Sequence, residues 1–281
     1  MKFVSYITRE GAPLPGILDG ETIRRIDAPS MRDYIALPAA QRAARHTNDT
    51  VALRDVTLDA PVRPNKNIFC VGRNYLEHAK EGAKIFGREL KLPDVPTFFT
   101  KAPTAIAAPG ATLHLQANIS NEYDFEAELT IVIGQRCKNV SEGDALGVIF
   151  GYTNLNDVTA RDLQRSHLQW FKGKSLDDLA PYGPAIVSAD EVGDAQQLEI
   201  MFRLNGVEKQ HSNTKSMIFS IKRIVAEITK GQTLEPGDLI ATGTPEGVGF
   251  ARNPPEFLKD GDVMEVEIEK LGILRNTVSI R

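Results

Sequence analysis

The pattern of hydrophobic and polar positions changes near residue 60. Before that point, short apolar runs alternate with glycines and prolines, which predicts β-hairpins followed by a short helix around residues 35–44. Pro61 and Pro64 come next, and proline disfavours helix in the residue before it. We therefore predict a small N-terminal domain over residues 1–62, joined by a proline-containing linker to a larger domain over residues 63–281.

The larger domain combines strands and helices in an irregular order. Alternating or continuous apolar residues predict strands at 67–71, 125–133, 198–204, 263–268 and 272–280. The spacing of polar and apolar residues predicts helices at 74–86, 157–169 and 216–230. Because strands and helices do not alternate regularly, we predict an α+β fold that is mainly β, not a parallel βαβ sheet.

Two glutamates lie two positions apart in the predicted strand 125–133. The two-residue period of a strand sends Glu126 and Glu128 to the same face, about 6.7 Å apart along the strand. Two carboxylates this close repel each other unless a cation or a proton lies between them. Asp157, which follows another apolar stretch, supplies a third oxygen donor.

These three carboxylates predict a metal site, although spacing alone leaves alternatives open. The glutamates can equally lie on an exposed strand face in contact with water, and Asp157 can be the N-cap of the following helix. If they share a cation, carboxylates without histidine or thiolate select an oxygen-preferring ion, Mg²⁺ or Mn²⁺.

Two further groups have side chains suited to acid–base chemistry. A helix over residues 74–86 places His78 and Glu81 on one face, so that the carboxylate orients the imidazole as a general base. Lys174, held close to a metal, can stabilise a developing oxyanion. Spacing alone nevertheless favours a charged surface helix for the first pair and a surface position for the lysine.

A glycine-rich segment covers residues 242–249. It contains neither of the common nucleotide-binding glycine patterns, GxxxxGK[ST] and GxGxxG. A tight turn that presents the Thr244 hydroxyl and backbone N–H groups to an anionic ligand fits it better.

Composition and charge exclude several classes of partner. The chain has 281 residues, 42% hydrophobic and 25% charged, with a net charge of −4 and no long run of basic residues. This gives no basic surface for nucleic acid, and no stretch approaches the roughly 18 apolar residues of a transmembrane helix. We expect a cytoplasmic protein that binds neither nucleic acid nor membranes. Cys70 and Cys137 have no metal-binding or redox spacing.

The order of the motifs along residues 64–281 resembles the fumarylacetoacetate hydrolase family. The resemblance runs through Gly72-Arg73-Asn74-Tyr75, with His78 and Glu81, and continues through the segments 99–103, 124–129, 156–164, 173–175, 234–240, 242–249 and 261–276. It implies the rolled, mixed β-sheet fold of the fumarylacetoacetase C-terminal domain, preceded by a small N-terminal domain and usually assembled as a homodimer.

The resemblance also implies roles for individual residues. The ligands of Mg²⁺ or Mn²⁺ are then Glu126, Glu128 and Asp157. His78 and Glu81 form a water-activating pair on a lid, and Lys174 stabilises the oxyanion. Gln164 and Thr244 match positions that contact substrate.

The expected reaction is metal-dependent hydrolysis of a carbon–carbon bond in a small 2,4-dioxo acid of the acylpyruvate or fumarylpyruvate type, with release of pyruvate or a related 2-oxo acid. The alternatives are an oxaloacetate-type decarboxylase, and an isomerase or hydratase of unsaturated 2-oxo dioic acids in aromatic catabolism. A binder without activity is disfavoured, since every polar position of the family's chemistry is present. We expect lid residues such as Ile85, Phe86 and Arg88 to select the acyl group.

Overall fold

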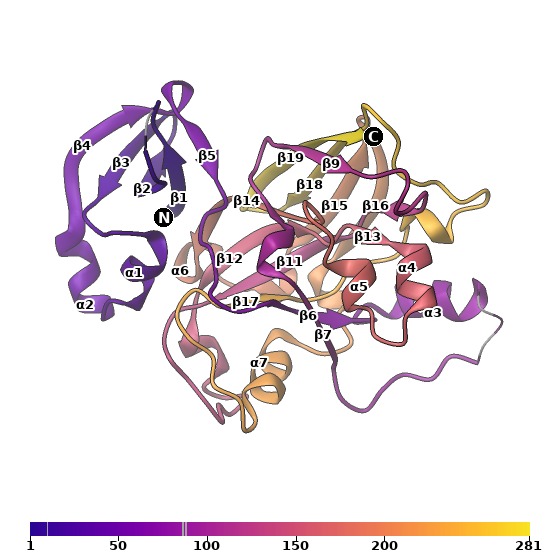
Figure 1. Cartoon of the computed structure of the whole chain (residues 1–281). Coiled ribbons are helices and arrows are strands. Elements are labelled where there is room, and N and C mark those ends of the chain that lie inside the picture. Colours follow the sequence, from indigo (N-terminus) through magenta and orange to yellow (C-terminus); the bar gives the residue numbers. More distant parts are fainter. Residues whose placement is uncertain (10, 86, 88) are drawn as a thin grey trace.

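The computed structural model describes residues 1–281 except residues 10, 86 and 88. Strands dominate the architecture, and short helices surround the sheets (Figure 1). Two of the residues expected to select the acyl group, Phe86 and Arg88, lie outside the described residues. The third, Ile85, is exposed at the end of helix α3 (Leu76–Ile85).

The larger sheet runs in the order β4-β3-β2-β1-β14-β12-β11-β17-β6-β7, with β5 paired to β1 and β8 paired to β14. Its N-terminal strands are β1 (Lys2–Ile7), β2 (Leu14–Asp19), β3 (Thr22–Ile26), β4 (His46–Ala52) and β5 (Thr57–Asp59). Its remaining strands are β6 (Ile68–Gly72), β7 (Thr97–Lys101), β8 (Ile106–Ala107), β11 (Ala127–Ile133), β12 (Ile149–Asn156), β14 (Ala180–Ser188) and β17 (Leu239–Ala241).

The second sheet has the order β16-β15-β18-β19-β9. Its strands are β9 (Thr112–Leu115), β15 (Glu199–Leu204), β16 (Val207–Asn213), β18 (Val263–Ile268) and β19 (Gly272–Ile280). A separate short ladder joins β10 (Tyr123–Asp124) to β13 (Thr159–Ala160). The predicted strands at 263–268 and 272–280 are found at those bounds, because each alternates between buried and more exposed positions.

The α-helices are short: α1 (Met31–Ala36), α2 (Ala39–Arg42), α3 (Leu76–Ile85), α4 (Arg161–Ser166), α5 (Phe171–Lys174), α6 (Ala189–Val192) and α7 (Ile221–Thr229). The helix expected at 35–44 is divided because Pro38 holds Leu37 extended, which ends α1. The helix expected at 216–230 begins only after Ser220, whose side chain accepts a hydrogen bond from the Arg223 N–H.

The main core lies between the two sheets. Strands β11 and β12 pack against β15 and β18. The ring of Phe125 stacks on that of Phe202 at a centroid distance of 4.2 Å. Helix α7 adds Ile221, Ile224 and Ile228 to the same core. Strand β11 is therefore buried on both faces, and its near-continuous apolar sequence reflects that position.

The N-terminal segment extends the larger sheet, because β1 pairs antiparallel with β14. A second core joins the two parts of the chain: Phe3 and Tyr34 pack in it with Phe150 and Leu239. A domain boundary near residue 62 stays a prediction. The α+β, mainly β class is confirmed. Over the described residues, no helix combines the length and apolar character needed to cross a bilayer.

Candidate functional site

Antiparallel pairing brings the three predicted carboxylates together. Glu126 immediately precedes β11 and Asp157 immediately follows β12, and these ends of the two strands lie opposite each other. The Asp157 N–H donates to the Glu126 carbonyl oxygen at 2.8 Å. One carboxylate oxygen each from Glu126, Glu128 and Asp157 lies within 4.8 Å of the others, so this group could hold a metal ion.

Burial excludes the two alternatives for these carboxylates. Glu126, Glu128 and Asp157 are 5%, 1% and 0% exposed, so no solvated strand face exists at the glutamates. The N-cap of α4 is Ala160, and Asp157 lies three residues before it. The predicted helix 157–169 starts late because residues 159–160 pair with β10 instead.

Two buried lysines form hydrogen bonds with the carboxylates. Lys174, only 2% exposed, donates from Nζ to Glu126 Oε2 at 2.7 Å and to Asp157 Oδ2 at 2.6 Å. Lys101 donates to Asp157 Oδ1 at 2.6 Å. A surface position for Lys174 is thereby excluded. Close packing of α5 on α4 places Lys174 beside the carboxylates. Gly173 permits this packing, because a Cβ there would lie 2.5 Å from the backbone nitrogen of Gln164.

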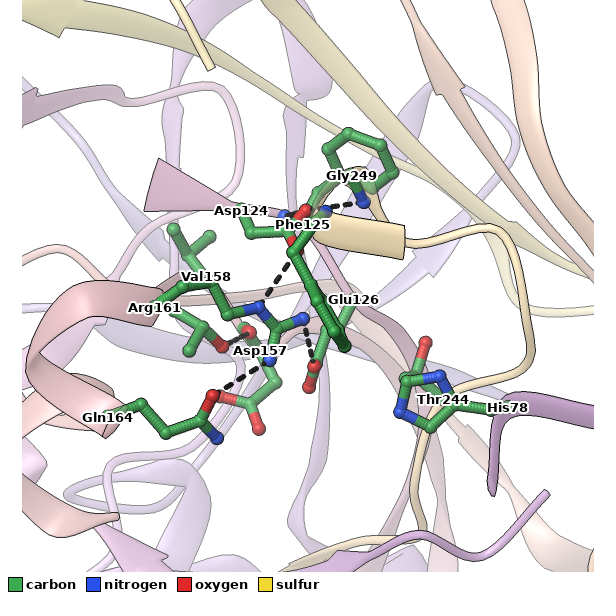
Figure 2. A network of polar contacts seen from close by, with 12 residues as sticks. His78, Asp124, Phe125, Glu126, Asp157, Val158, Arg161, Gln164, Thr244 and Gly249 are labelled. Carbon is green, nitrogen blue, oxygen red and sulfur yellow. Dashed lines mark hydrogen bonds and ion pairs between the residues drawn. The ribbon is translucent and has the colours of Figure 1, made fainter. Parts of the chain in front are cut away.

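Arg161 links several polar groups at the start of α4 (Figure 2). Its guanidinium donates from Nη2 to Glu126 Oε1 at 2.6 Å, from Nε to Asp124 Oδ2 at 2.8 Å and from Nη1 to Gln164 Oε1 at 3.1 Å. Asp124 is fixed in turn by the backbone N–H groups of Phe125, Gly249 and Phe250. Because Arg161 occupies Gln164 Oε1, the Gln164 amide nitrogen is the group left for a ligand.

The two glutamates differ in their electrostatic surroundings. Burial alone raises the pKa of Glu126, but Lys174 and Arg161 outweigh it and hold that pKa below its ordinary value. For Glu128, burial and the nearby charges of Asp157 and Glu126 raise the pKa well above its ordinary value. Glu128 Oε2 accepts a hydrogen bond from the Gly243 N–H at 2.8 Å.

The difference in charge around Glu126 and Glu128 tests whether the predicted metal site is physically reasonable. An unpaired buried carboxylate is costly, and Glu128 has a neutral donor where Glu126 has two cations. A divalent cation held by Glu126, Glu128 and Asp157 removes the repulsion, and an all-carboxylate donor set suits Mg²⁺ or Mn²⁺. The residues present therefore fit the ion.

His78 lies on α3 at the wall of the cavity. Its Nδ1 lies 3.4 Å from Glu81 Oε2, and Glu81 Oε1 accepts the Gly247 N–H at 2.9 Å. Thr244, on the same glycine-rich turn, accepts a hydrogen bond from Gln210 Nε2 at 2.8 Å. His78 is half-buried, which excludes a position on a fully solvated surface helix. The 3.4 Å separation is loose, as catalytic contacts often are without ligand.

A cavity of about 640 Å³ connects these groups. It is lined by six of the eight predicted site residues, namely His78, Glu126, Glu128, Gln164, Lys174 and Thr244. The other two do not line it: Glu81 supports His78 from outside the cavity, and Asp157 lies behind Lys174. Figure 2 shows His78 and Thr244 on one side of the carboxylates and Gln164 with Arg161 on the other.

Three residues at the site have no role predicted from the sequence: Lys101, Asp124 and Arg161. All three lie inside motif segments, but the pairing of Asp124 with Arg161 depends on the short β10–β13 ladder. Lys101 comes from the end of β7, and nothing local indicates that it reaches Asp157. The sequence could indicate only that several buried carboxylates require buried cations close by, without indicating which residues supply them.

The chain is similar to known proteins in sequence and in fold. Residues 67–279 match the family model described as fumarylacetoacetate (FAA) hydrolase, C-terminal. The chain is 42% identical over 228 residues to the oxaloacetate tautomerase YisK of Bacillus subtilis (strain 168). The aligned region covers 81% of this chain and 74% of that protein.

Two solved structures are similar over the whole chain. The fumarylacetoacetate hydrolase (EaFAH) from psychrophilic Exiguobacterium antarcticum has a TM-score of 0.85 and 35% identity, covering 100% of both chains. The 2-hydroxyhepta-2,4-diene-1,7-dioate isomerase from Mycobacterium marinum has a TM-score of 0.81 and 36% identity, covering 100% of this chain and 99% of that chain. The fold expected from the motif order is confirmed, and the chain belongs to the fumarylacetoacetate hydrolase family.

Proposed function

We propose that this protein is a divalent-metal-dependent enzyme that interconverts the enol and keto forms of oxaloacetate or a closely related 2-oxo dicarboxylate. The observation that carries the proposal is the position of His78, a proton-transfer group oriented by Glu81, on the wall of the cavity that Glu126 and Glu128 also line. The similarity to an oxaloacetate tautomerase over most of the chain supports this reaction over the hydrolysis expected from the motifs.

The chemistry requires one proton to leave the enol oxygen and another to arrive at the adjacent carbon. A bound divalent ion supplies Lewis acidity that stabilises negative charge on the 2-oxo oxygen. His78 Nε2 accepts the proton of the enol oxygen and delivers a proton to the adjacent carbon, so the imidazole is regenerated. Glu81 contacts Nδ1 and thereby fixes the orientation of the ring. The Gln164 amide and the Thr244 hydroxyl hold the substrate carboxylate, and the Lys174 ammonium balances negative charge.

Hydrolysis of an acylpyruvate is the second candidate. The His78–Glu81 pair favours it, since an imidazole oriented by a carboxylate can also activate water for attack on a distal carbonyl. A similar solved structure carries the name fumarylacetoacetate hydrolase. The two reactions differ in whether water takes part, while the carboxylates, Lys174 and His78 serve both.

One assay separates the candidates. With Mg²⁺ or Mn²⁺, we expect the protein to accelerate the decay of the ultraviolet absorbance of enol-oxaloacetate and to release little pyruvate from acetylpyruvate. His78→Gln should slow the decay by roughly 10²–10⁴-fold, the usual contribution of a general base. Lys80→Gln, on the same helix but paired with Glu77 in solvent, is the matched control and should retain activity.

The outcomes are distinct. Pyruvate release from acetylpyruvate without acceleration of enol decay would replace the tautomerase by the hydrolase. Normal enol decay in His78→Gln would remove the base assignment. If neither substrate reacts, both candidates are wrong.

A further inference from the structure

Arg73 lies at the mouth of the cavity without a carboxylate partner among the described residues. The other arginines and the buried lysine that line the cavity are neutralised: Arg161 by Asp124 and Glu126, Lys174 by Glu126 and Asp157, and Arg165 by Glu122. Arg73 is exposed, and its guanidinium lies over the face of Trp170, with Cζ 5.6 Å from the ring centroid.

Trp170 is held rigidly as a platform for this guanidinium. A Cβ on Gly72 would lie 2.4 Å from Trp170 Cζ3, so the indole packs directly on the backbone at the end of β6. The ring of Phe99 also meets the indole edge-on, with the ring centroids 5.3 Å apart. An arginine stacked on a fixed aromatic ring loses little freedom when it binds an anion.

Arg73 lines the cavity and has an unusual backbone conformation. Its φ of 56° lies in the left-handed region, which residues other than glycine rarely adopt. The next residue, Asn74, is fully buried and bonds to the backbone of Phe219 in both directions and to the Thr242 carbonyl. Close packing at Gly72 and this anchor at Asn74 determine the turn between them. Strain of this kind is concentrated at ligand-binding positions.

We propose that Arg73 binds the second carboxylate of a dicarboxylate substrate and so makes the site selective for 2-oxo dicarboxylates over neutral acylpyruvates. This inference rests on the proposed function. The 2-oxo acid end of the substrate occupies the carboxylate cluster, and the distal carboxylate extends to the mouth of the cavity. There the planar guanidinium of Arg73 offers two parallel N–H donors.

Oxaloacetate and acetylpyruvate test this inference because they share the 2-oxo acid end and differ by a carboxylate in place of an acetyl group. Dissociation constants for both should be measured by calorimetry with the Mn²⁺-loaded protein, beside KM and kcat for oxaloacetate. Arg73→Gln should weaken oxaloacetate binding by about 10- to 100-fold, the range of charge-assisted hydrogen bonds. The dissociation constant for acetylpyruvate and the kcat for oxaloacetate should each change by less than about 3-fold, because the altered contact is not at the reacting atoms.

Two further variants complete the test. Lys91→Gln removes another exposed cation that lines the same cavity, and it should leave the preference for oxaloacetate intact. Arg73→Lys keeps the charge but loses the planar fork, and should fall between the native protein and Arg73→Gln. Unchanged melting temperatures exclude misfolding as the cause, and Arg73→Lys still tests the inference if Arg73→Gln does not fold.

The inference is overturned if both ligands weaken equally in Arg73→Gln, if Lys91→Gln has the same effect, or if the native protein binds oxaloacetate no better than acetylpyruvate. Failure of the proposed function gives a different result, since the native protein would then bind oxaloacetate preferentially without accelerating enol decay.

Discussion

At the scale of single residues, Lys101 shows how the carboxylate cluster is supported. It is 0% exposed, and its Nζ donates to Asp157 Oδ1 at 2.6 Å and to the Val158 carbonyl at 3.0 Å. Burial lowers the pKa of Lys101, and the charge of Asp157 offsets part of that effect. Because Lys101 does not line the cavity, we assign it to positioning Asp157 rather than to contact with substrate.

Replacement of Lys101 should therefore act on stability first. Lys101→Met leaves one oxygen of a fully buried carboxylate without its cation, and we expect the free energy of unfolding to fall by about 3–5 kcal/mol. Urea denaturation of the metal-free protein measures it. Lys80→Met breaks an exposed pair with Glu77 and should change little. A loss in Lys101→Met no greater than in Lys80→Met would contradict a supporting role.

The local sequence predicts the two glutamates of this site but not the cations that surround them. Glu126 and Glu128 could be found because a two-residue spacing on an apolar strand is a local signal. Their partners are different: Lys101 and Arg161 reach the cluster through strand pairing across the fold. No local pattern encodes that pairing, so the cations around the carboxylates had to come from the structure.

At the scale of elements, the packing of α5 on α4 sets the distance between two predicted site residues. Gln164 lies on α4 and Lys174 ends α5. Gly173 lets the two helices touch, since a Cβ there would lie 2.5 Å from the Gln164 nitrogen and 2.8 Å from the Ala160 carbonyl oxygen. Both obstacles are backbone atoms, so the added methyl group has no flexible side chain to displace.

Gly173→Ala is expected to separate α4 from α5. The free energy of unfolding should fall by about 1–3 kcal/mol, as overpacking usually causes, and activity should fall because Gln164 and Lys174 no longer face one ligand. Thermal unfolding and enol decay measure the two effects. Gly147→Ala is the control, since a Cβ there meets no atom within 4 Å. Equal stability and activity in the two variants would show that the close contact is unimportant.

Prediction of elements succeeded where burial alternates along one segment, as in β18 and β19. It was wrong about the start of α4. Thr159 and Ala160 have no strong strand signal of their own, and they are extended because they pair with Tyr123 and Asp124. Tertiary pairing outweighed local preference at this position.

At the scale of the whole molecule, one core spans the predicted boundary near residue 62. Phe3 is 2% exposed, and its ring lies 4.9 Å from Phe150 and 5.6 Å from Tyr34, centroid to centroid. Phe150 belongs to β12, the strand that ends beside Asp157. We therefore expect residues 1–62 and the rest of the chain to unfold together.

Phe3→Ala tests this coupling. It should lower the free energy of unfolding by about 3–5 kcal/mol, as large-to-small core changes do. Trp170 is the single tryptophan and lies at the cavity, so its fluorescence reports on the larger part of the chain. Fluorescence and circular dichroism should shift together. A fluorescence transition left unchanged in Phe3→Ala, as in the exposed control Val207→Ala, would indicate independent domains.

The central claim is that Glu126, Glu128 and Asp157 hold one divalent ion. Titration with Mn²⁺, followed by electron paramagnetic resonance, tests it most directly because it does not depend on turnover. We predict one tightly bound ion per native chain, with binding weakened at least about 10-fold in Glu128→Gln. Binding should not change in Glu122→Gln, which alters a partly exposed carboxylate paired with Arg165. Equal Mn²⁺ affinity in Glu128→Gln and the native protein, or no bound Mn²⁺ in the native protein, would contradict the account.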